Sequence, residues 1–152
     1  MRHDSLAEAN CSIARAWAVL GERWTMVILR QAFLGARRFE DYQSGLGIAR
    51  NMLADRLRTL VEHAILERRA YQEHPPRYEY RLTPKGLDLY PLLVSLMQWG
   101  DRYGEHEGGP PVELVHRPCG HLADPRFTCA HCGGEITARE MRAQPGPGAQ
   151  AA

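Results

Sequence analysis

Residues 39–63 read FEDYQSGLGIARNMLADRLRTLVEH, and this stretch decides the fold. The pattern predicts a short helix over 39–45 and a second helix from Ile48 to about His63. Between them, Gly45-Leu46-Gly47 indicates a tight turn, because glycine adopts backbone angles that other residues avoid. Two helices joined in this way are typical of a helix-turn-helix.

The helix expected over 48–63 has an apolar and a polar face at a rotation of about 100° per residue. The apolar face, expected in the core, consists of Ala49, Leu53, Leu57 and Leu60. The opposite face carries Asn51, Asp55, Arg58 and Glu62. In a DNA recognition helix, Asn51 would pair with adenine, and Arg50 or Arg58 would reach guanine or phosphate. Asp55 would accept from cytosine or orient Arg58. An ordinary solvated face is the alternative for this helix taken alone.

The flanking sequence predicts a winged helix-turn-helix. Upstream, apolar residues at helical spacing predict helices over 13–20 and 24–34. Downstream, 66–71 and 78–82 resemble two strands around the turn at Pro75-Pro76, and Thr83 caps one long last helix. The predicted fold class is therefore mainly α (α+β), with a two-stranded wing after the helix-turn-helix and a small Cys-rich β extension.

Charge favours DNA binding only locally, because 19 basic and 18 acidic residues leave a net charge of +1. Arg77 follows the two prolines of the wing tip, which restrict the loop, so it would reach a minor groove or a phosphate with little loss of entropy. Arg37 and Arg38 precede the short helix, where phosphates usually run. The residues expected to contact double-stranded DNA are Arg37, Arg38, Arg50, Asn51, Asp55, Arg58 and Arg77.

The last helix predicts a homodimer. Its apolar residues cover more than one face, which a second copy can bury and a single small domain cannot. They are Leu87, Leu89, Tyr90, Leu92, Leu93, Val94, Leu96, Met97 and Trp99. A twofold dimer would place two recognition helices in successive major grooves of a near-palindromic operator.

Composition excludes several classes of protein. Residues 1–10 are polar, unlike a secretory signal, and no apolar run is long enough for a membrane span. We therefore expect a cytoplasmic protein without a membrane partner, whose four cysteines stay reduced. The sequence shows no nucleophile–base pair and no phosphate-binding loop, so we do not expect an enzyme.

Shifts in composition predict five parts of the chain. These are an arm over 1–10, a DNA-binding and dimerisation domain over 11–103, a linker over 104–111, a Cys-rich segment over 112–140 and a disordered tail over 141–152. The Cys-rich segment is too short to build a core of its own, which favours a structural metal.

The Cys-rich segment contains two knuckles, His116-x2-Cys119 and Cys129-x2-Cys132, each followed by a glycine that lets the backbone turn around a metal. Reduced thiols at this spacing resemble a small zinc ribbon with zinc as its structural cofactor. The expected ligands are Cys119, Cys129, Cys132 and His116. His121 is the alternative fourth ligand, and a metal-free hairpin is the alternative to a zinc site.

Motifs from residue 11 to about 103 resemble the HxlR-type regulators, which are relatives of the MarR regulators. The matching stretches include Cys11-Ser-Ile-Ala, Gly21-Glu-Arg-Trp-Thr25, Pro75-Pro-Arg-Tyr-Glu-Tyr80-Arg-Leu-Thr83 and Gln98-Trp99-Gly100. The resemblance implies a dimeric winged helix that activates or represses transcription, with dimer contacts from the first and last helices.

The resemblance also implies a sensing cysteine. Some members of the family sense electrophiles or oxidants through an N-terminal Cys-Pro motif. Cys11 matches the cysteine, with Ser12 in place of the proline. Because a helix N-terminus stabilises a thiolate, Cys11 is the redox-sensing candidate, and an oxidant or a small molecule is the expected inducer.

Taken together, the sequence predicts a sequence-specific DNA-binding transcriptional regulator that acts as a homodimer. The alternative is a zinc-dependent protein-interaction module whose winged helix no longer binds DNA. The small net charge and Asp55 on the recognition face favour that alternative slightly.

Overall fold

The structure is a computed structural model that describes residues 6–149, and the chain divides into two compact units, Met1–Ser95 and Leu96–Ala152. The first unit contains α2 (Ser12–Leu20), α3 (Thr25–Phe33), α4 (Phe39–Leu46), α5 (Arg50–Glu62), β1 (Leu66–Gln72), β2 (Arg77–Leu82) and α6 (Pro84–Leu87). The helix α7 (Tyr90–Tyr103) spans the division, and the second unit contains β3 (Val115–His116) and β4 (His121–Leu122). Parts of the expected arm and tail, 1–5 and 150–152, lie outside the described residues.

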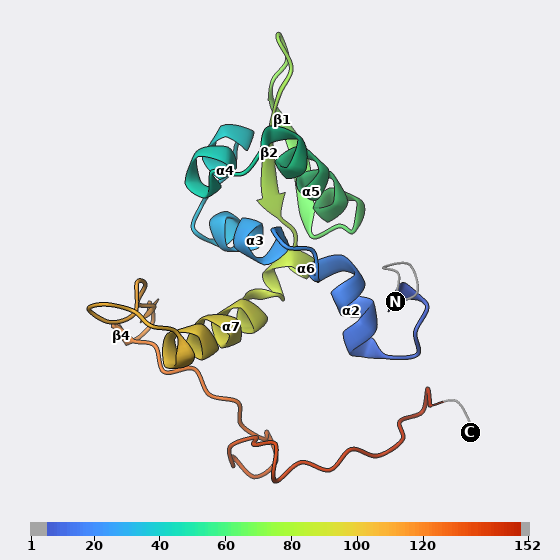
Figure 1. The fold of residues 1–152 in the computed structure, drawn as a ribbon, viewed down its shortest axis with the longest axis vertical. Helices are drawn as coiled ribbons and strands as arrows, with labels where there is room; N and C mark the ends of the chain where they lie inside the picture. Colours follow the sequence, from blue (N-terminus) through green and yellow to red (C-terminus); the bar gives the residue numbers. More distant parts are fainter. Residues whose placement is uncertain (1–5, 150–152) are drawn as a thin grey trace. The chain divides into compact units, whose positions relative to one another are not determined.

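The wing is an antiparallel pair of β1 and β2, in which Leu66 lies opposite Leu82 and Ala70 opposite Tyr78. The base of this hairpin is buried and its distal half is exposed. Figure 1 shows the hairpin running past the ends of α4 and α5, so that its tip stands clear of the helices of the first unit. The order of helices and strands is that of a winged helix-turn-helix of the α+β class, as predicted.

The core of the first unit lies between α3, α5 and the base of the wing. Its completely or almost completely buried aliphatic side chains are Ile28, Leu29, Leu53, Leu57, Leu60 and Leu66. Each contributes about 2 kcal/mol relative to an exposed position. Tyr42 of α4 is equally buried, and its hydroxyl donates to the carbonyl oxygen of Ala36 at 3.1 Å, which satisfies its polar atom.

The turn of the helix-turn-helix depends on Gly47, whose φ of +61° lies in the left-handed region that favours glycine. This residue ends α4 with an amide that donates to the carbonyl oxygen of Gln43. The prediction that Ala49 lies in the core is wrong. Ala49 is the exposed N-cap residue of α5, and Ile48 occupies the buried position before it.

The prediction of one long last helix is also wrong, because α6 ends at Leu87 and α7 begins at Tyr90. Thr83 does cap α6, accepting a hydrogen bond from the amide of Gly86 at 3.1 Å. The interruption follows from Pro91, which has no amide hydrogen and whose ring would clash with the carbonyl of Leu87 in a continuous helix. In the observed structure Pro91 falls in the first turn of α7, where the missing donor is not needed.

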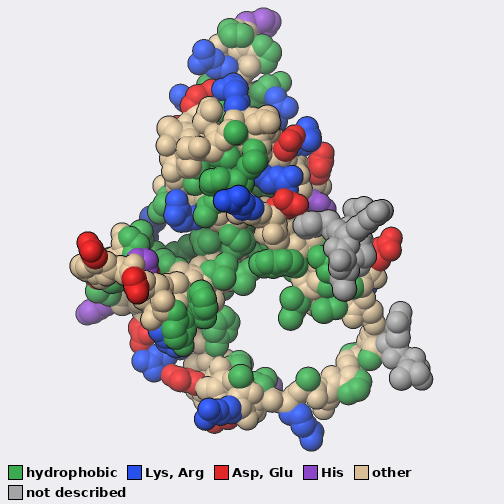
Figure 2. Space-filling view, in the orientation of Figure 1, with side chains coloured by type: hydrophobic (Ala, Val, Ile, Leu, Met, Phe, Trp, Pro, Cys, Tyr) green, Lys and Arg blue, Asp and Glu red, His purple; other side chains and the backbone are tan. Residues whose placement is uncertain are grey.

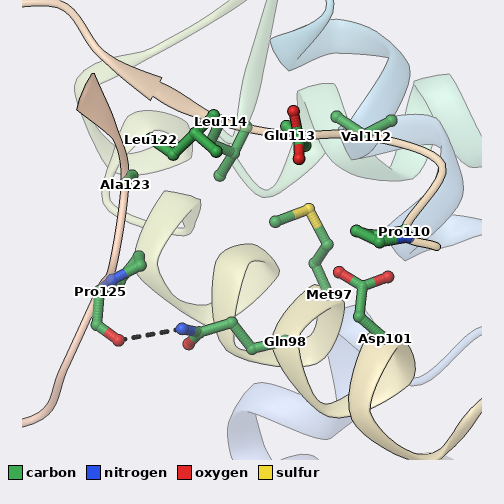
Figure 3. Close-up of a pocket in the computed structure, with 10 residues that line it drawn as sticks. All are labelled: Met97, Gln98, Asp101, Pro110, Val112, Glu113, Leu114, Leu122, Ala123 and Pro125. Carbon is green, nitrogen blue, oxygen red and sulfur yellow. Dashed lines mark hydrogen bonds between the residues drawn. The ribbon is translucent and has the colours of Figure 1, made fainter. Parts of the chain in front are cut away.

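The second unit has little core. None of residues 96–149 is buried, and several of its larger apolar side chains, including Val115, Leu122 and Phe127, are more than half exposed. Gln98 on α7 donates to the carbonyl oxygen of Pro125 at 3.0 Å, which ties the Cys-rich segment to the end of this helix (Figure 3). No helix among residues 6–149 is long and apolar enough to cross a membrane.

Candidate nucleic-acid interface

The N-terminal turn of α5 presents Arg50 and Asn51 to solvent. Arg50 stacks its guanidinium on the ring of Phe39, with 4.7 Å between them, and approaches the side-chain oxygen of Gln43 at 3.5 Å. Asn51 makes no side-chain hydrogen bond within the described part of the chain, so its amide is available to a base edge. The structure therefore holds Arg50 in place and leaves Asn51 uncommitted.

Further along the exposed face of α5, Asp55 and Arg58 form an ion pair, with 2.7 Å between Oδ1 and Nη2. The Nε of Arg58 lies 3.9 Å from a carboxylate oxygen of Glu62. Asp55 was expected either to accept a hydrogen bond from cytosine or to orient Arg58. In this structure, which contains no DNA, the carboxylate of Asp55 holds the guanidinium of Arg58. The two carboxylates also offset the charge of Arg58, which weakens it as a phosphate contact.

The predicted pair before α4 separates into two different environments. Arg37 turns inward and donates through Nη1 to the carbonyl oxygens of Ala32 and Ala36, both at 3.2 Å, at the C-terminal end of α3. Arg38 remains exposed, and its guanidinium lies 4.6 Å from the ring of Tyr71 on the wing. This geometry supports a structural role for Arg37 and a surface role for Arg38.

The backbone around these arginines is fixed by Asp41, whose carboxylate accepts from the amides of Arg38 at 2.8 Å and Arg37 at 3.1 Å. The same hydrogen bonds hold the pKa of Asp41 below its usual value. In addition, the amide of Tyr80 in β2 donates to the carbonyl oxygen of Arg37 at 2.7 Å. The loop before α4 is thereby attached to the wing.

On the wing, Arg77 is exposed at the first residue of β2 and makes no side-chain hydrogen bond or ion pair among residues 6–149. Sequence reasoning missed the aromatic side chains that support the other arginines. Arg68 lies 3.5 Å from the ring of Tyr78, its diagonal neighbour across the β1–β2 pair. The strand register could have revealed this contact. Ala70 lies opposite Tyr78, and Arg68 lies two residues before Ala70 on the same face of the wing.

Figure 2 shows Lys and Arg side chains over the wing and the helices beside it, interspersed near α5 with Asp and Glu. Three of these arginines, Arg38, Arg50 and Arg68, rest on aromatic rings contributed by the same unit. Cation–π stacking holds a guanidinium in place while its N–H donors still face outward. The surface therefore presents pre-oriented donors rather than a strong net positive field.

Large apolar side chains are exposed on α2 and α7. On α2, Ile13 is 78% and Trp17 54% exposed, and on α7, Trp99 is 66% and Tyr103 66% exposed. Leu92 and Leu96 add further apolar area on α7. Exposed apolar area on a helix, which each of these two helices has, is typical of a surface covered by a partner.

The thiol of Cys11 is exposed at the N-cap position of α2. The carbonyl oxygen of Cys11 accepts a hydrogen bond from the amide of Arg15 at 3.0 Å, and the Nε of Arg15 donates to the carbonyl oxygen of Ala9 at 2.9 Å. An exposed thiol at a helix N-terminus has the accessibility that a reactive cysteine requires.

The predicted zinc ligands occur as two separate pairs. The Nδ1 of His116 lies 3.2 Å from the Sγ of Cys119, and Cys132 makes a side-chain hydrogen bond with Cys129. The structure does not join the pairs, because residues 6–149 contain no group of three or more His, Cys, Asp or Glu side chains placed to hold a metal. His121 lies opposite His116 in the β3–β4 hairpin.

A pocket of about 200 Å³ lies in the second unit, between α7 and residues 110–125. Figure 3 shows Met97 pointing from α7 toward the stretch that carries Val112 and Leu114. The carboxylates of Asp101 and Glu113 also line it. Because pockets for small molecules usually measure about 300–1,000 Å³, we assign no inducer to this one.

The helix-turn-helix, the wing and the outward-facing donors on both define a winged-helix DNA-binding protein. The chain belongs to the HxlR-like helix-turn-helix family, which it matches over residues 19–108. It is a transcriptional regulator of this MarR-related type, and the family assignment is to regulators rather than enzymes.

Its relatives fall into long and short matches. The uncharacterised HTH-type transcriptional regulator Rv3095 of Mycobacterium tuberculosis is 52% identical over 140 residues, covering 92% of this chain and 89% of Rv3095. The crystal structure of PA1607, a candidate transcription factor, is 41% identical with a TM-score of 0.81, covering 92% of this chain and 98% of PA1607. The redox regulator HypR in its reduced form is 28% identical with a TM-score of 0.57, covering 60% of this chain and 92% of HypR.

The share of this chain covered by each match indicates which relatives have a counterpart to the Cys-rich segment. A match over 92% of the chain leaves out about a dozen residues, so most of 112–140 has a counterpart in Rv3095 and in PA1607. The match to HypR leaves out 40% of this chain while covering nearly all of HypR. Rv3095 and PA1607 therefore have a counterpart to most of the Cys-rich segment, whereas 40% of this chain has no counterpart in the match to HypR.

Proposed function

We propose that this regulator binds a near-palindromic operator as a homodimer in the cytoplasm and that α5 and the wing make its DNA contacts. The observation that carries the proposal is the exposed, uncommitted Asn51 at the start of α5, beside arginines held in place by aromatic rings. An amide at that position suits a bidentate contact to adenine, and the arginines suit phosphate or guanine. Arg77 at the wing contributes a phosphate or minor-groove contact.

Within this set we assign different roles to the residues according to their side-chain contacts. Arg50, Asn51, Arg38 and Arg77 are the direct contacts, whereas Arg37 supports the backbone before α4 through its bonds to Ala32 and Ala36. Arg58 contacts DNA only after Asp55 releases it or turns with it toward a cytosine. The alternative role, a protein-interaction module without DNA binding, is not favoured by membership in a family of transcriptional regulators.

A selection of bound sequences from a random DNA pool, followed by affinity measurements at several salt concentrations, tests the proposal. Arg77→Ala should weaken binding to all sequences and reduce the slope of log K against log salt by about one. Asn51→Ala should instead change preference at one base pair by about 1–3 kcal/mol. Arg139→Ala, an exposed arginine in the second unit, is the control and should leave both quantities unchanged. If the first two variants bind the selected operator like the wild type, the docking proposal is wrong.

The homodimer is supported by the exposed apolar side chains of α2 and α7. Because Trp17 and Trp99 are more than half exposed, Trp17→Asp and Trp99→Asp should leave each chain folded but place a charge in the proposed interface. Light scattering should then report monomers. Leu34→Asp on an equally exposed apolar residue outside α2 and α7 is the matched control. An unchanged dimer in both tryptophan variants would refute the interface.

A thiol response through Cys11 is supported by the exposure of the thiol and by likeness to HypR, which is described as a redox regulator. A quinone or peroxide should change operator affinity in the wild type and leave it constant in Cys11→Ser. Thiol-labelling kinetics provide an independent measure. A Cys11 that labels no faster than the thiols of the unfolded chain would eliminate this response.

A further inference from the structure

The two knuckles of the second unit have the same backbone architecture. In the first, Val115 pairs with Leu122, and the amide of Gly120 donates to the carbonyl oxygen of His116 at 2.8 Å. In the second, Thr128 pairs with Glu135, and the amide of Gly133 donates to the carbonyl oxygen of Cys129 at 2.7 Å. A shift of 13 residues superimposes every one of these positions.

The correspondence extends to the turn that follows each second donor. Gly120 has φ +73° and Gly133 has φ +72°, a backbone conformation that favours glycine. No atom lies close enough to clash with an added Cβ, so the backbone angle alone disfavours other residues at these two positions. Each turn places two potential metal ligands next to each other, the imidazole and thiol of His116 and Cys119 in one and two thiols in the other. Identical turns carrying paired Cys or His donors are half-sites of a tetrahedral metal centre.

The local geometry suits zinc in each half-site. Zn–S and Zn–N bonds of about 2.3 and 2.0 Å at a tetrahedral angle separate sulfur and nitrogen by about 3.5 Å, close to the 3.2 Å between His116 Nδ1 and Cys119 Sγ. In the second knuckle, the amides of Cys132 and His131 and the side chain of Cys132 all form hydrogen bonds with Cys129, which places the two sulfurs beside each other. Two adjacent sulfurs with amide donors beside them are typical of one side of a tetrahedral Cys-rich zinc site.

The second unit also needs a source of stability that its apolar residues do not provide. None of residues 96–149 is buried, and the hairpins expose Val115, Leu122, Phe127 and Ile136. A segment of this size without a core is usually held by a metal, disulfides or a partner. The two hairpins are separated by residues 123–127, which form neither helix nor strand. A connection of this kind lets the two pairs of ligands bind the same ion.

We propose that the knuckles His116–Cys119 and Cys129–Cys132 close around one structural Zn²⁺ per chain, coordinated by three cysteine sulfurs and His116 Nδ1. Binding would displace a proton from each of the three thiols, so affinity should rise with pH. His121 and His131 are not ligands in this arrangement. The proposed metal site is separate from the proposed DNA-binding surface, because its ligands lie between residues 116 and 132 and the match to the DNA-binding family ends at residue 108.

Elemental analysis of full-length protein, purified with a reductant and without chelator, should find about one zinc per chain. The Co²⁺-loaded protein should show the visible bands of a tetrahedral ion and near-ultraviolet thiolate charge transfer. Cys129→Ser and His116→Ala should each weaken metal binding by roughly a hundredfold or more in competition with a chromophoric chelator. His131→Ala and His121→Ala are the matched controls and should bind like the wild type.

Limited proteolysis of the wild type gives a readout that does not depend on the folding of any variant. Chelation should open 112–140 to protease while 12–95 stays protected, and added Zn²⁺ should restore protection. Metal-free protein, a Cys129–Cys132 disulfide in place of the metal, or one zinc shared by two chains would each overturn the proposal. Loss of zinc in His121→Ala with retention in His116→Ala would equally overturn the assigned ligand set.

Discussion

The two units of this chain are stabilised in different ways. The first buries a continuous set of leucines and isoleucines between α3, α5 and the wing, whereas the second buries none of its described residues. Glycine plays opposite roles too, since Gly86 is enclosed by neighbouring atoms and Gly120 and Gly133 are in open space. The difference indicates that the first unit is held mainly by the packing of its core, and the second by turns and, in our proposal, a metal.

The largest expected difference between the units comes from shortening a leucine in each. Leu57 is completely buried, so Leu57→Ala should reduce the free energy of unfolding by about 2–5 kcal/mol. Leu122 is 59% exposed, so Leu122→Ala should change it by less than about 0.5 kcal/mol. Urea unfolding followed by helical circular dichroism, at one protein concentration, measures both. Comparable losses would show that the second unit shares the core of the first.

The next effect is expected from adding a methyl group to a glycine in each unit. A Cβ on Gly86 would overlap the backbone carbonyl of Ile65, which cannot move without shifting the base of the wing. Gly86→Ala should therefore destabilise the fold by about 2–3 kcal/mol. Gly146→Ala meets no atom and should leave the same urea midpoint unchanged. A tolerated Gly86→Ala would contradict the close packing of α6 on the chain leading into β1.

Much of the first unit could be predicted from sequence because its pattern is local. Helical spacing and the two glycines around Leu46 located the helix-turn-helix, and the prolines located the wing turn. The break between α6 and α7 was missed because the apolar spacing continues across it, while the steric effect of Pro91 on Leu87 acts between residues four apart. Local signals thus predicted the elements better than their interruption.

The candidate site was less predictable, because side-chain partners depend on tertiary contacts. Sequence alone treated Arg37 and Arg38 alike, yet one guanidinium turns in toward Ala32 and Ala36 and the other lies over Tyr71. Similarly, the spacing of the knuckles gave their donors but not how the two pairs lie with respect to each other. Residue identity indicated which groups could act, and three-dimensional placement decided which of them face outward.

A smaller loss of stability is expected when a threonine that forms a side-chain hydrogen bond in each unit is replaced by alanine. Thr83 accepts from the amide of Gly86 at 3.1 Å and donates to the carbonyl oxygen of Ala64 at 2.6 Å, which joins α6 to the segment before β1. Thr83→Ala should cost about 1–2 kcal/mol. The hydroxyl of Thr137 donates to the carboxylate of Glu140 at an exposed position, so Thr137→Ala should leave the urea midpoint unchanged in the same experiment. Equal losses would mean that the turns of the second unit are coupled to global unfolding.

The smallest effect, and the one that depends on pH, concerns one aspartate in each unit. The amides of Arg38 and then Arg37 hold the pKa of Asp41 below its usual value, so its contribution is present above about pH 4 and is lost as the pH falls through the lower folded value. Because Asp41 is exposed, solvent screening limits the contribution to about 0.5–1 kcal/mol at pH 7. Asp41→Ala should therefore be less stable than the wild type at pH 7, and the gap should narrow steadily toward pH 2. Asp124 is exposed and forms an ion pair with Arg126 in the second unit. Because an exposed ion pair contributes little to stability, Asp124→Ala should unfold like the wild type at pH 7. A gap for Asp41→Ala that stays constant with pH would show that the residue acts through its shape, and not through the charge that accepts the two amides before α4.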